Sequence, residues 1–247
     1  YDITLRPDNT LAVRFKNIIE KACTTTGMKV AILIDEYDSP LQHSWKTPQH
    51  EACTGIYKDV FAVLKTQDKY EKFVFITGIT KFTQISLFSV LNNLSNISFN
   101  PQYAALCGIT QQEITDNFLP EIKAMGEKNN WTVDEVMEQL KDNYDGYHFS
   151  KRSEDVFNPF SLILAMSHQE LGNYWFGSGT PSYIINVMRK FHVGIRDIEG
   201  KSASVREFDV SPEQMTTALP LLYQSGYLTI KTYNRVTNRF ILDYPNR

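Results

Sequence analysis

The chain has 247 residues, of which 42% are hydrophobic and 21% charged, so it can bury a globular core in one large domain or two small ones. Its formal net charge of −3 argues against a uniformly basic coat for nucleic acid, although it leaves room for a local basic patch. Three cysteines without close spacing, Cys23, Cys53 and Cys107, argue against a disulfide framework or a zinc site and favour a reducing, cytoplasmic setting.

The sequence gives no sign of a membrane segment or an export signal. It contains no run of about 18 apolar residues, the length that a membrane-spanning helix needs. Its first residues, Tyr1 to Thr4, do not have the features of a signal peptide. We therefore expect no membrane partner and a cytoplasmic location. Because the chain does not begin with Met, we also expect it to be a portion of a longer protein.

The first predicted elements are a helix and a buried strand. Apolar residues at helical spacing predict an amphipathic helix over about residues 11–25, which Gly27 ends. The five apolar residues Val30 to Ile34 then predict a strand covered on both faces, as in a parallel sheet. This strand runs into the acidic pair Asp35 and Glu36. Ligands of open α/β sheets gather at such strand ends, so we expect the two carboxylates to face a cation.

The order of the two acids is typical of nucleotide hydrolases. In P-loop enzymes, an acid directly after this kind of strand helps to hold Mg²⁺, and a second acid can orient and deprotonate the attacking water. The sequence therefore predicts Asp35 as a metal ligand, directly or through water, and Glu36 as the group that activates water. The alternative is an ordinary buried strand whose acids cap the next turn, because the pattern is short.

A second helix, predicted over about residues 55–69, leads into a second apolar strand over residues 73–78. Strand, helix and strand in this order predict a parallel βαβ unit with a right-handed crossover, in which both strands end at the same edge. Thr77 then lies beside the two acids, where a hydroxyl could sense the γ-phosphate and its water. Lys81 could reach the same edge as a phosphate contact. The alternatives are a threonine that only ends its strand and a solvated lysine.

From Thr110 onward the sequence favours helices. Thr110 and Thr132 each begin the threonine–x–x–acid pattern of a capping box, which predicts one helix over about residues 110–125 and another from Thr132. Two prolines predict helix starts at Asn158–Pro159 and at Pro181. His148 lies in an aromatic turn between these helices. Because no Cys or second His lies at metal spacing, we expect it to be packed or solvated.

The last forty residues predict a small separate module. A helix is expected from Ser211 to Gly226, followed by strands over residues 227–231 and 239–243 with a turn at Asn234. A helix followed by a hairpin is typical of the end of a winged helix. Basic residues on such a hairpin can contact DNA phosphates. Nearby acidic residues leave the module with little net positive electrostatic potential, so we favour an internal lid over DNA binding. The basic residues are Lys231, Arg235, Arg239 and Arg247, and the acids are Glu207, Asp209, Glu213 and Asp243.

Seven segments of the chain resemble, in the same order, those of the AAA-ATPase-like family. The members are bacterial proteins that often carry a nuclease-like domain of the PD-(D/E)XK class after the ATPase portion. The similarity extends over about residues 11–232. The segments are residues 30–40, 73–82, 91–98, 144–147, 157–161, 173–176 and 179–182.

The resemblance implies an α/β fold with a partial P-loop NTPase core of the additional-strand type and a parallel sheet. A helical lid and a winged-helix-like module follow. Residues 1–108 are then the ATPase core fragment with the Walker B and sensor strands, residues 109–204 the lid, and residues 205–247 the winged-helix-like module. The implied cofactors are ATP and Mg²⁺, and a C-terminal nuclease-like domain is an implied partner in the full protein.

The sequence departs from the family in one respect. No glycine-rich loop of the form G-x-x-x-x-G-K-[ST] occurs in it. Without that loop, the β- and γ-phosphates lack their principal binding groups. In the family the loop precedes this segment, so we expect a truncated portion of the protein; a degenerate relative is the alternative. The strand before the loop normally lies between those ending at Asp35 and Thr77, so we expect another strand to fill its place.

We therefore expect the intact protein to bind and hydrolyse ATP-Mg and to use the reaction for a conformational change. Asp35 is the predicted metal ligand, Glu36 and Thr77 are the predicted catalytic residues, and Lys81 is the predicted nucleotide contact. The present chain alone is expected to be inactive for lack of the phosphate loop. The alternative is a nucleotide-independent regulatory or DNA-binding module, in which the acidic strand end is vestigial.

Overall fold

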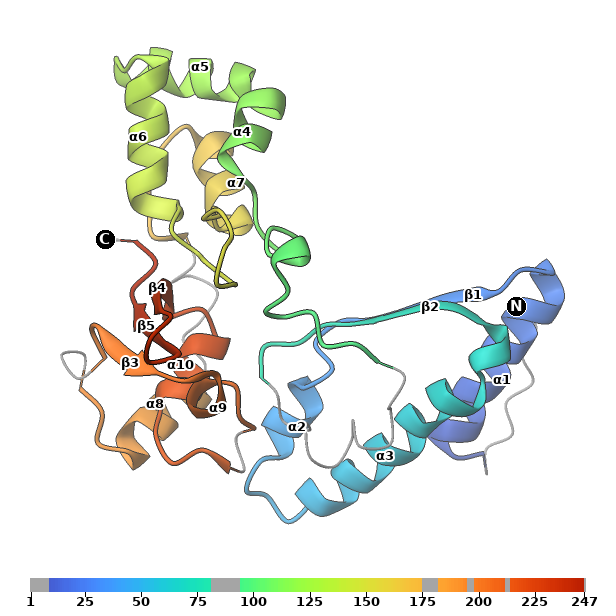
Figure 1. Ribbon diagram of the computed structural model, residues 1–247. Helices are drawn as coiled ribbons and strands as arrows, with labels where there is room; N and C mark the ends of the chain where they lie inside the picture. The colour runs from blue at the N-terminus through green and yellow to red at the C-terminus, as the bar shows by residue number, and fades with distance from the viewer. Residues whose placement is uncertain (1–8, 81–93, 175–181, 195–197, 212–213, 247) are drawn as a thin grey trace. The chain divides into compact units, whose positions relative to one another are not determined.

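The computed structural model describes residues 9–80, 94–174, 182–194, 198–211 and 214–246. These residues form two compact units (Figure 1). The first unit comprises Tyr1–Ser95 with Val210–Met215, and the second comprises Asn96–Asp209 with Thr216–Arg247. The division into core, lid and winged-helix-like module stays a prediction.

The first unit is an α/β arrangement around a two-stranded parallel sheet. Its opening helix begins after Thr10, whose hydroxyl accepts a hydrogen bond from the N–H of Val13, and ends at Gly27, which has a left-handed φ of 68°. The sheet strands pair in register up to Ile34 and Ile76. The elements in chain order are α1 Leu11–Thr26, β1 Val30–Ile34, α2 Ser39–Ser44, α3 His50–Thr66, the 3-10 turn η1 Asp68–Tyr70 and β2 Glu71–Ile76.

The predicted strand–helix–strand unit is confirmed, but the prediction that another strand would lie between its two strands is wrong. β1 and β2 are hydrogen-bonded directly to one another. The pairing even continues past the strands, because the N–H of Thr77 donates to the carbonyl of Ile34 at 2.8 Å. No place for a further strand exists between them, since this ladder uses the facing backbone groups of both.

The prediction that β1 is covered on both faces is also wrong for the described residues. Ile32 is buried in a cluster with Ile19 of α1 and Phe61 of α3. On the other face, Leu33 is 72% exposed and Phe73 of β2 is 54% exposed. In a strand, successive side chains point to opposite faces, so helices that pack against one face leave the other open.

Helices dominate the first part of the second unit. Both predicted capping boxes are present, because Thr110 and Thr132 each exchange hydrogen bonds with the acid three residues later. The single helix predicted over residues 110–125 is instead two helices, which meet at Phe118, two residues before Pro120. The helices are α4 Gln111–Asn117, α5 Leu119–Asn129, α6 Val133–Tyr144 and α7 Pro159–His168.

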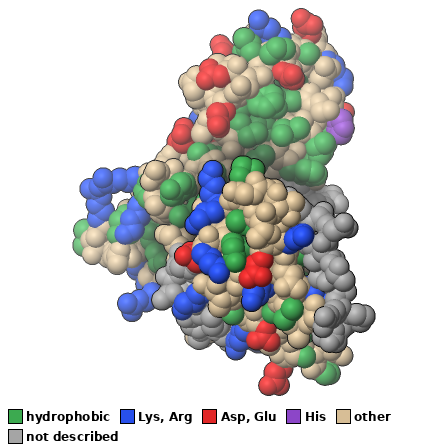
Figure 2. Space-filling view, turned by 90° about the vertical axis from the view of Figure 1, so that its right-hand side faces the viewer, with side chains coloured by type: hydrophobic (Ala, Val, Ile, Leu, Met, Phe, Trp, Pro, Cys, Tyr) green, Lys and Arg blue, Asp and Glu red, His purple; other side chains and the backbone are tan. Residues whose placement is uncertain are grey.

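These helices lie together (Figure 1), and their buried side chains form one core. Ile114, Met125, Val136 and Leu140 are fully buried in it. Hydrophobic side chains also reach the surface of this part of the molecule (Figure 2). Among the described residues, no helix is both long and apolar enough to cross a membrane.

The remainder of the second unit contains a three-stranded antiparallel sheet with the order β3-β5-β4. The hairpin was predicted, including the turn at Asn234, whose side chain accepts two backbone hydrogen bonds. The helix before it begins at Leu219, and the prediction of a start at Ser211 is wrong. The third strand was not predicted. The elements are η2 Pro101–Tyr103, α8 Ser182–Lys190, β3 Lys201–Ala203, α9 Val205–Phe208, α10 Leu219–Gln224, β4 Thr229–Asn234 and β5 Arg239–Asp243.

Candidate functional site

The candidate site lies where β1 and β2 end. The N–H of Thr77 donates to the carbonyl of Ile34, and the carbonyl of Thr77 accepts from the N–H of Tyr37 at 3.0 Å. Thr77 is therefore held by backbone bonds on both sides of the acidic pair. Parallel strands present their carboxyl ends at one edge, so the polar residues after both strands come together there.

The structure brings Asp35 and Thr77 into direct contact. The hydroxyl of Thr77 donates a hydrogen bond to Oδ1 of Asp35. The N–H of Glu36 donates to the same oxygen at 2.9 Å. Both acidic residues are exposed, and within the described residues nothing donates to the second oxygen of Asp35. One carboxylate oxygen is thus fixed in place, and Asp35 as a whole is exposed.

Glu36 adopts a left-handed backbone conformation with φ of 50°. This conformation is uncommon for residues with a side chain. It turns the chain sharply after Asp35, while the carbonyl of Glu36 accepts from the N–H of Ser39 at 2.9 Å. Glu36 therefore lies in the turn directly after Asp35 and does not continue β1. The remaining predicted residue, Lys81, lies outside the described residues.

The oxygen donors at this strand end suit Mg²⁺. This ion prefers oxygen ligands, keeps several waters, and binds proteins through one or two carboxylates together with phosphate oxygens. The exposed carboxylate of Asp35, oriented by Thr77 and by the N–H of Glu36, matches that donor set. Among the residues placed by the structure, no group of three or more His, Cys, Asp or Glu side chains could hold a metal by itself. A metal here would depend on ligands from water and substrate.

Sequence reasoning assigned no role to Asp38, the third acid of the same segment. Its side chain is only 1% exposed and accepts hydrogen bonds from the N–H groups of Ile79 and Thr80. A local signal exists, because an acid before Ser39 and Pro40 predicts a helix N-cap. Asp38 is indeed the residue before α2, but its side chain makes no capping bond to that helix and reaches the segment after β2 instead.

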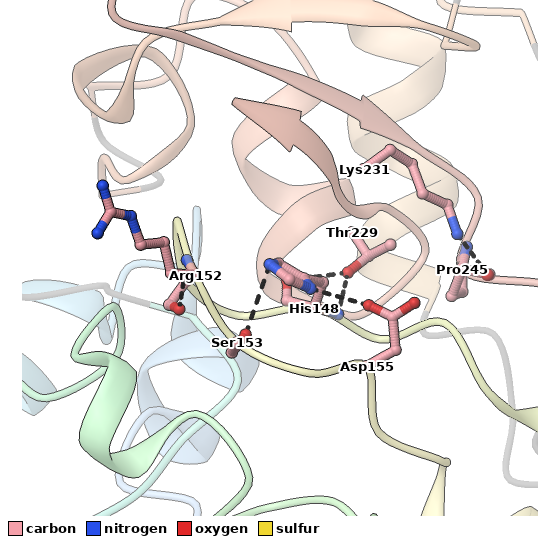
Figure 3. A network of polar contacts seen from close by, with 8 residues as sticks. His148, Arg152, Ser153, Asp155, Thr229, Lys231 and Pro245 are labelled. Carbon is pink, nitrogen blue, oxygen red and sulfur yellow. Dashed lines mark hydrogen bonds and ion pairs between the residues drawn. The ribbon is translucent and has the colours of Figure 1, made fainter. Parts of the chain in front are cut away.

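His148, predicted to be packed or solvated, belongs to a polar network in the second unit (Figure 3). Its Nδ1 lies 2.8 Å from Oδ1 of Asp155, and Ser153 Oγ lies 3.5 Å from its Nε2. Its backbone is tied to the hydroxyl of Thr229 in β4, which accepts from the His148 N–H at 2.7 Å and donates to its carbonyl at 3.0 Å. The hydrogen bond from His148 lowers the pKa of Asp155. The network joins this turn to the antiparallel sheet.

The first part of the chain is similar to a known protein family. Residues 1–88 match a family model described as a predicted AAA-ATPase, of the AAA-ATPase-like family. A protein of Azotobacter chroococcum mcd 1, described as "Uncharacterized protein in vnfD 5'region", is 32% identical over 240 residues. These residues cover 94% of this chain and 43% of that protein, so the chain spans less than half of that relative's length. No solved structure gives a significant match. The residues that match the AAA-ATPase-like family, 1–88, contain β1, β2 and the acidic strand end.

Proposed function

We propose that the chain is part of an ATPase that, in the full-length protein, binds ATP-Mg and hydrolyses the γ-phosphate. The observation that carries this proposal is the contact of Thr77 with Asp35, beside Glu36, at the carboxyl ends of two parallel strands. The match of residues 1–88 to predicted AAA-ATPases supports it. We also propose a cytoplasmic location.

Each residue of the strand end has a proposed part in the reaction. Asp35 holds Mg²⁺, directly or through a water, with its carboxylate. Glu36 orients the attacking water and takes its proton, and Thr77 contacts the γ-phosphate or its water while it orients Asp35. We propose Lys81 as a further phosphate contact. When bound, Mg²⁺ neutralises charge on the phosphate oxygens, so the protein contributes mainly positioning and electrostatic stabilisation.

The proposal requires a phosphate-binding loop that the sequence does not contain in the G-x-x-x-x-G-K-[ST] form. The backbone N–H groups and lysine of such a loop bind the β- and γ-phosphates in P-loop enzymes. We propose that residues outside these 247 supply it. The greater length of the relative from Azotobacter is consistent with such residues.

We propose that hydrolysis changes the placement of the parts that follow the core. Residues 1–108 would form the partial P-loop core, residues 109–204 a helical lid and residues 205–247 a winged-helix-like module. The order β3, α9, α10, β4, β5 and the sheet order β3-β5-β4 support a winged helix. A nuclease-like domain after this module is a proposed partner.

We favour an internal role for this module over DNA binding, because its basic residues are partly engaged within the protein. Arg239 forms an ion pair with Glu207 at 3.0 Å, and Lys231 donates to the carbonyl of Pro245 at 2.6 Å. DNA phosphates would have to displace Glu207 from Arg239 and the Pro245 carbonyl from Lys231.

The absence of the phosphate-loop motif favours a second candidate function. In this alternative the protein is a regulatory or DNA-binding module that uses no nucleotide, and the acidic strand end is vestigial. The two candidates differ in what the full-length protein does with ATP.

Phosphate release by the full-length protein, with and without Mg²⁺, tests the proposal. We expect ATP hydrolysis that depends on Mg²⁺, and we expect residues 1–247 alone to bind ATP weakly in calorimetry because they lack the loop. A full-length protein that neither binds nor hydrolyses ATP would contradict the proposal. Micromolar ATP binding by residues 1–247 alone would show that groups other than such a loop hold the phosphates.

A further inference from the structure

We infer that Asp38 is a positioning residue of this site, whose buried carboxylate fixes the backbone after β2 and thereby keeps Thr77 against Asp35. The inference rests on the proposed function. It assigns a separate role to the third acid of the segment, which neither the family match nor the pattern of the strand end identifies.

The carboxylate of Asp38 receives four hydrogen bonds. Oδ1 accepts from the N–H of Ile79 at 3.1 Å. Oδ2 accepts from the N–H of Thr80, from the hydroxyl of Thr80 and from Nε2 of Gln42, each at 2.6 Å. A charged acceptor that is buried this deeply needs such donors, and hydrogen bonds to an ionised group are stronger than neutral ones. Asp38 therefore ties the start of α2 firmly to the segment after β2.

Gly78 allows this close approach. A Cβ at this position would lie 2.4 Å from Oδ1 of Asp38 and 2.5 Å from the ring of Tyr37, closer than real Cβ atoms come. Tyr37 adds another link, because its hydroxyl donates to the carbonyl of Thr80 at 2.8 Å. The backbone directly after Thr77 thus lies against Tyr37 and Asp38.

These contacts fix the backbone both at Thr77 and directly after Gly78, and so hold the Thr77–Asp35 hydrogen bond in place. On one side, the backbone of Thr77 is bonded to Ile34 and Tyr37. On the other side, Asp38 holds the two N–H groups that follow Gly78. If the Asp38 bonds were lost, the segment after β2 would be free to shift and to carry the hydroxyl of Thr77 away from Asp35. A displacement of about 1 Å in a catalytic group can lower a rate on the order of 10²-fold.

Asp38 is not a candidate metal ligand itself. Both of its oxygens are occupied by protein donors, and its side chain is 1% exposed. Asp35 and Glu36, in contrast, are exposed at the strand end. The segment therefore divides its acids into two that face solvent and one that holds the backbone.

The substitution Asp38→Asn in the full-length protein tests the inference. The amide has nearly the same shape, but its NH₂ group would face a donor, so at least one bond to Ile79 or Thr80 is lost. We expect kcat for ATP to fall about tenfold or more, with KM changed by less than about threefold, because the ground-state contacts to ATP remain. Asp59→Asn, at an exposed position of α3, is the matched control and should leave kcat unchanged.

A double-mutant cycle separates positioning from a general loss of structure. If Asp38 acts through Thr77, then Asp38→Asn combined with Thr77→Val should lower kcat no further than the more damaging single substitution. If the double variant instead lost kcat by the product of the two single-variant factors, the inference would be overturned. Should Asp38→Asn fail to fold, Thr80→Val removes only one of the four donors and should show a smaller loss with the same dependence on Thr77.

Amide hydrogen exchange gives a readout that does not depend on activity. In Asp38→Asn, the N–H groups of Thr77, Ile79 and Thr80 should exchange faster than in wild type, while those of the α4–α7 helices should not change. Wild-type exchange at these three sites would contradict the inference. A wild-type protein without ATP turnover would refute the proposed function, whereas turnover that Asp38→Asn does not alter would refute only the role of Asp38.

Discussion

The hydroxyl of Thr77 donates a hydrogen bond to Oδ1 of Asp35, although 42 positions separate the two residues in the chain. The contact exists because β1 and β2 are parallel neighbours that end together, and because the backbone of Thr77 pairs with residues on both sides of the acidic pair. It fixes one carboxylate oxygen of a residue that is exposed as a whole. In the proposed ATPase, this arrangement orients the metal ligand before substrate binds.

Replacing Thr77 with Val should therefore lower ATP turnover by the full-length protein. Valine keeps the shape of threonine but removes the donor to Asp35. Removal of one preorganised donor from an active site lowers kcat by about 10²-fold. Thr77→Ser retains the hydroxyl and should restore most of the rate. Phosphate-release kinetics of the two variants provide the comparison. Wild-type turnover in Thr77→Val would exclude a role for the hydroxyl.

Local signals in the sequence predicted much of this architecture. The apolar runs that end at Ile34 and Ile76 form the predicted strands. Thr110 and Thr132 begin helices with the predicted capping boxes. Capping and strand patterns depend on residues within a few positions of one another, so they can be read without knowledge of the fold. The contact of Asp35 with Thr77 followed from one further rule, that parallel strands end at the same edge.

Features that depend on distant partners were not predictable in this way. Asp38 receives hydrogen bonds from residues 41 and 42 positions away, and its local pattern indicated a helix cap. The exposed face of Leu33 also escaped prediction, because an apolar run does not show how many faces of a strand are covered. The start of α10 at Leu219 was also missed, because Ser211 and Pro212 give a helix-start signal in the sequence whereas Ala218, the residue before α10, makes no side-chain cap.

Glu207 gives a prediction about pH. Hydrogen bonds from the Ser204 hydroxyl and N–H, together with Arg239, lower the pKa of Glu207 from 4.5 to about 2. A group with a lowered pKa in the folded state stabilises the fold above its unfolded pKa, and that contribution is lost as the pH falls through the folded pKa. The stabilising contribution of Glu207 should therefore be complete at pH 7 and disappear between about pH 4.5 and pH 2.

Glu207→Gln should accordingly make the β3–β5 region less stable at pH 7 by at most about 1 kcal/mol, because exposed ion pairs and caps contribute little more. The difference from wild type should vanish near pH 2. Hydrogen exchange of the β3 and β5 amides measures the opening free energy of this sheet. Glu138→Gln, on the exposed side of α6, is the matched control. A difference that stays constant from pH 7 to pH 2 would mean that the ionised carboxylate is not the cause.

The hairpin formed by β4 and β5 gives a prediction about DNA. Since Arg239 is paired with Glu207, we expect negligible affinity of the full-length protein for DNA at physiological ionic strength. If the hairpin did bind phosphates, replacing Arg235 and Arg239 together with Gln should reduce the slope of log affinity against log salt by about two. Lys58 and Lys65, exposed on α3, provide a control pair of equal charge. Sub-micromolar, salt-sensitive binding that only the hairpin substitutions abolish would overturn the preference for an internal lid.

The most direct test of the proposed ATPase is Glu36→Gln in the full-length protein. Glutamine keeps the size of the side chain at the strand end but cannot take a proton from water, and removal of a positioned base costs on the order of 10²-fold or more. Turnover should fall by this factor while equilibrium binding of ATP stays within about threefold of wild type. Glu51→Gln, at an exposed position of α3, should change neither quantity. Unchanged turnover of Glu36→Gln, in a preparation free of contaminating ATPase, would contradict the assignment of this strand end as the site of ATP hydrolysis.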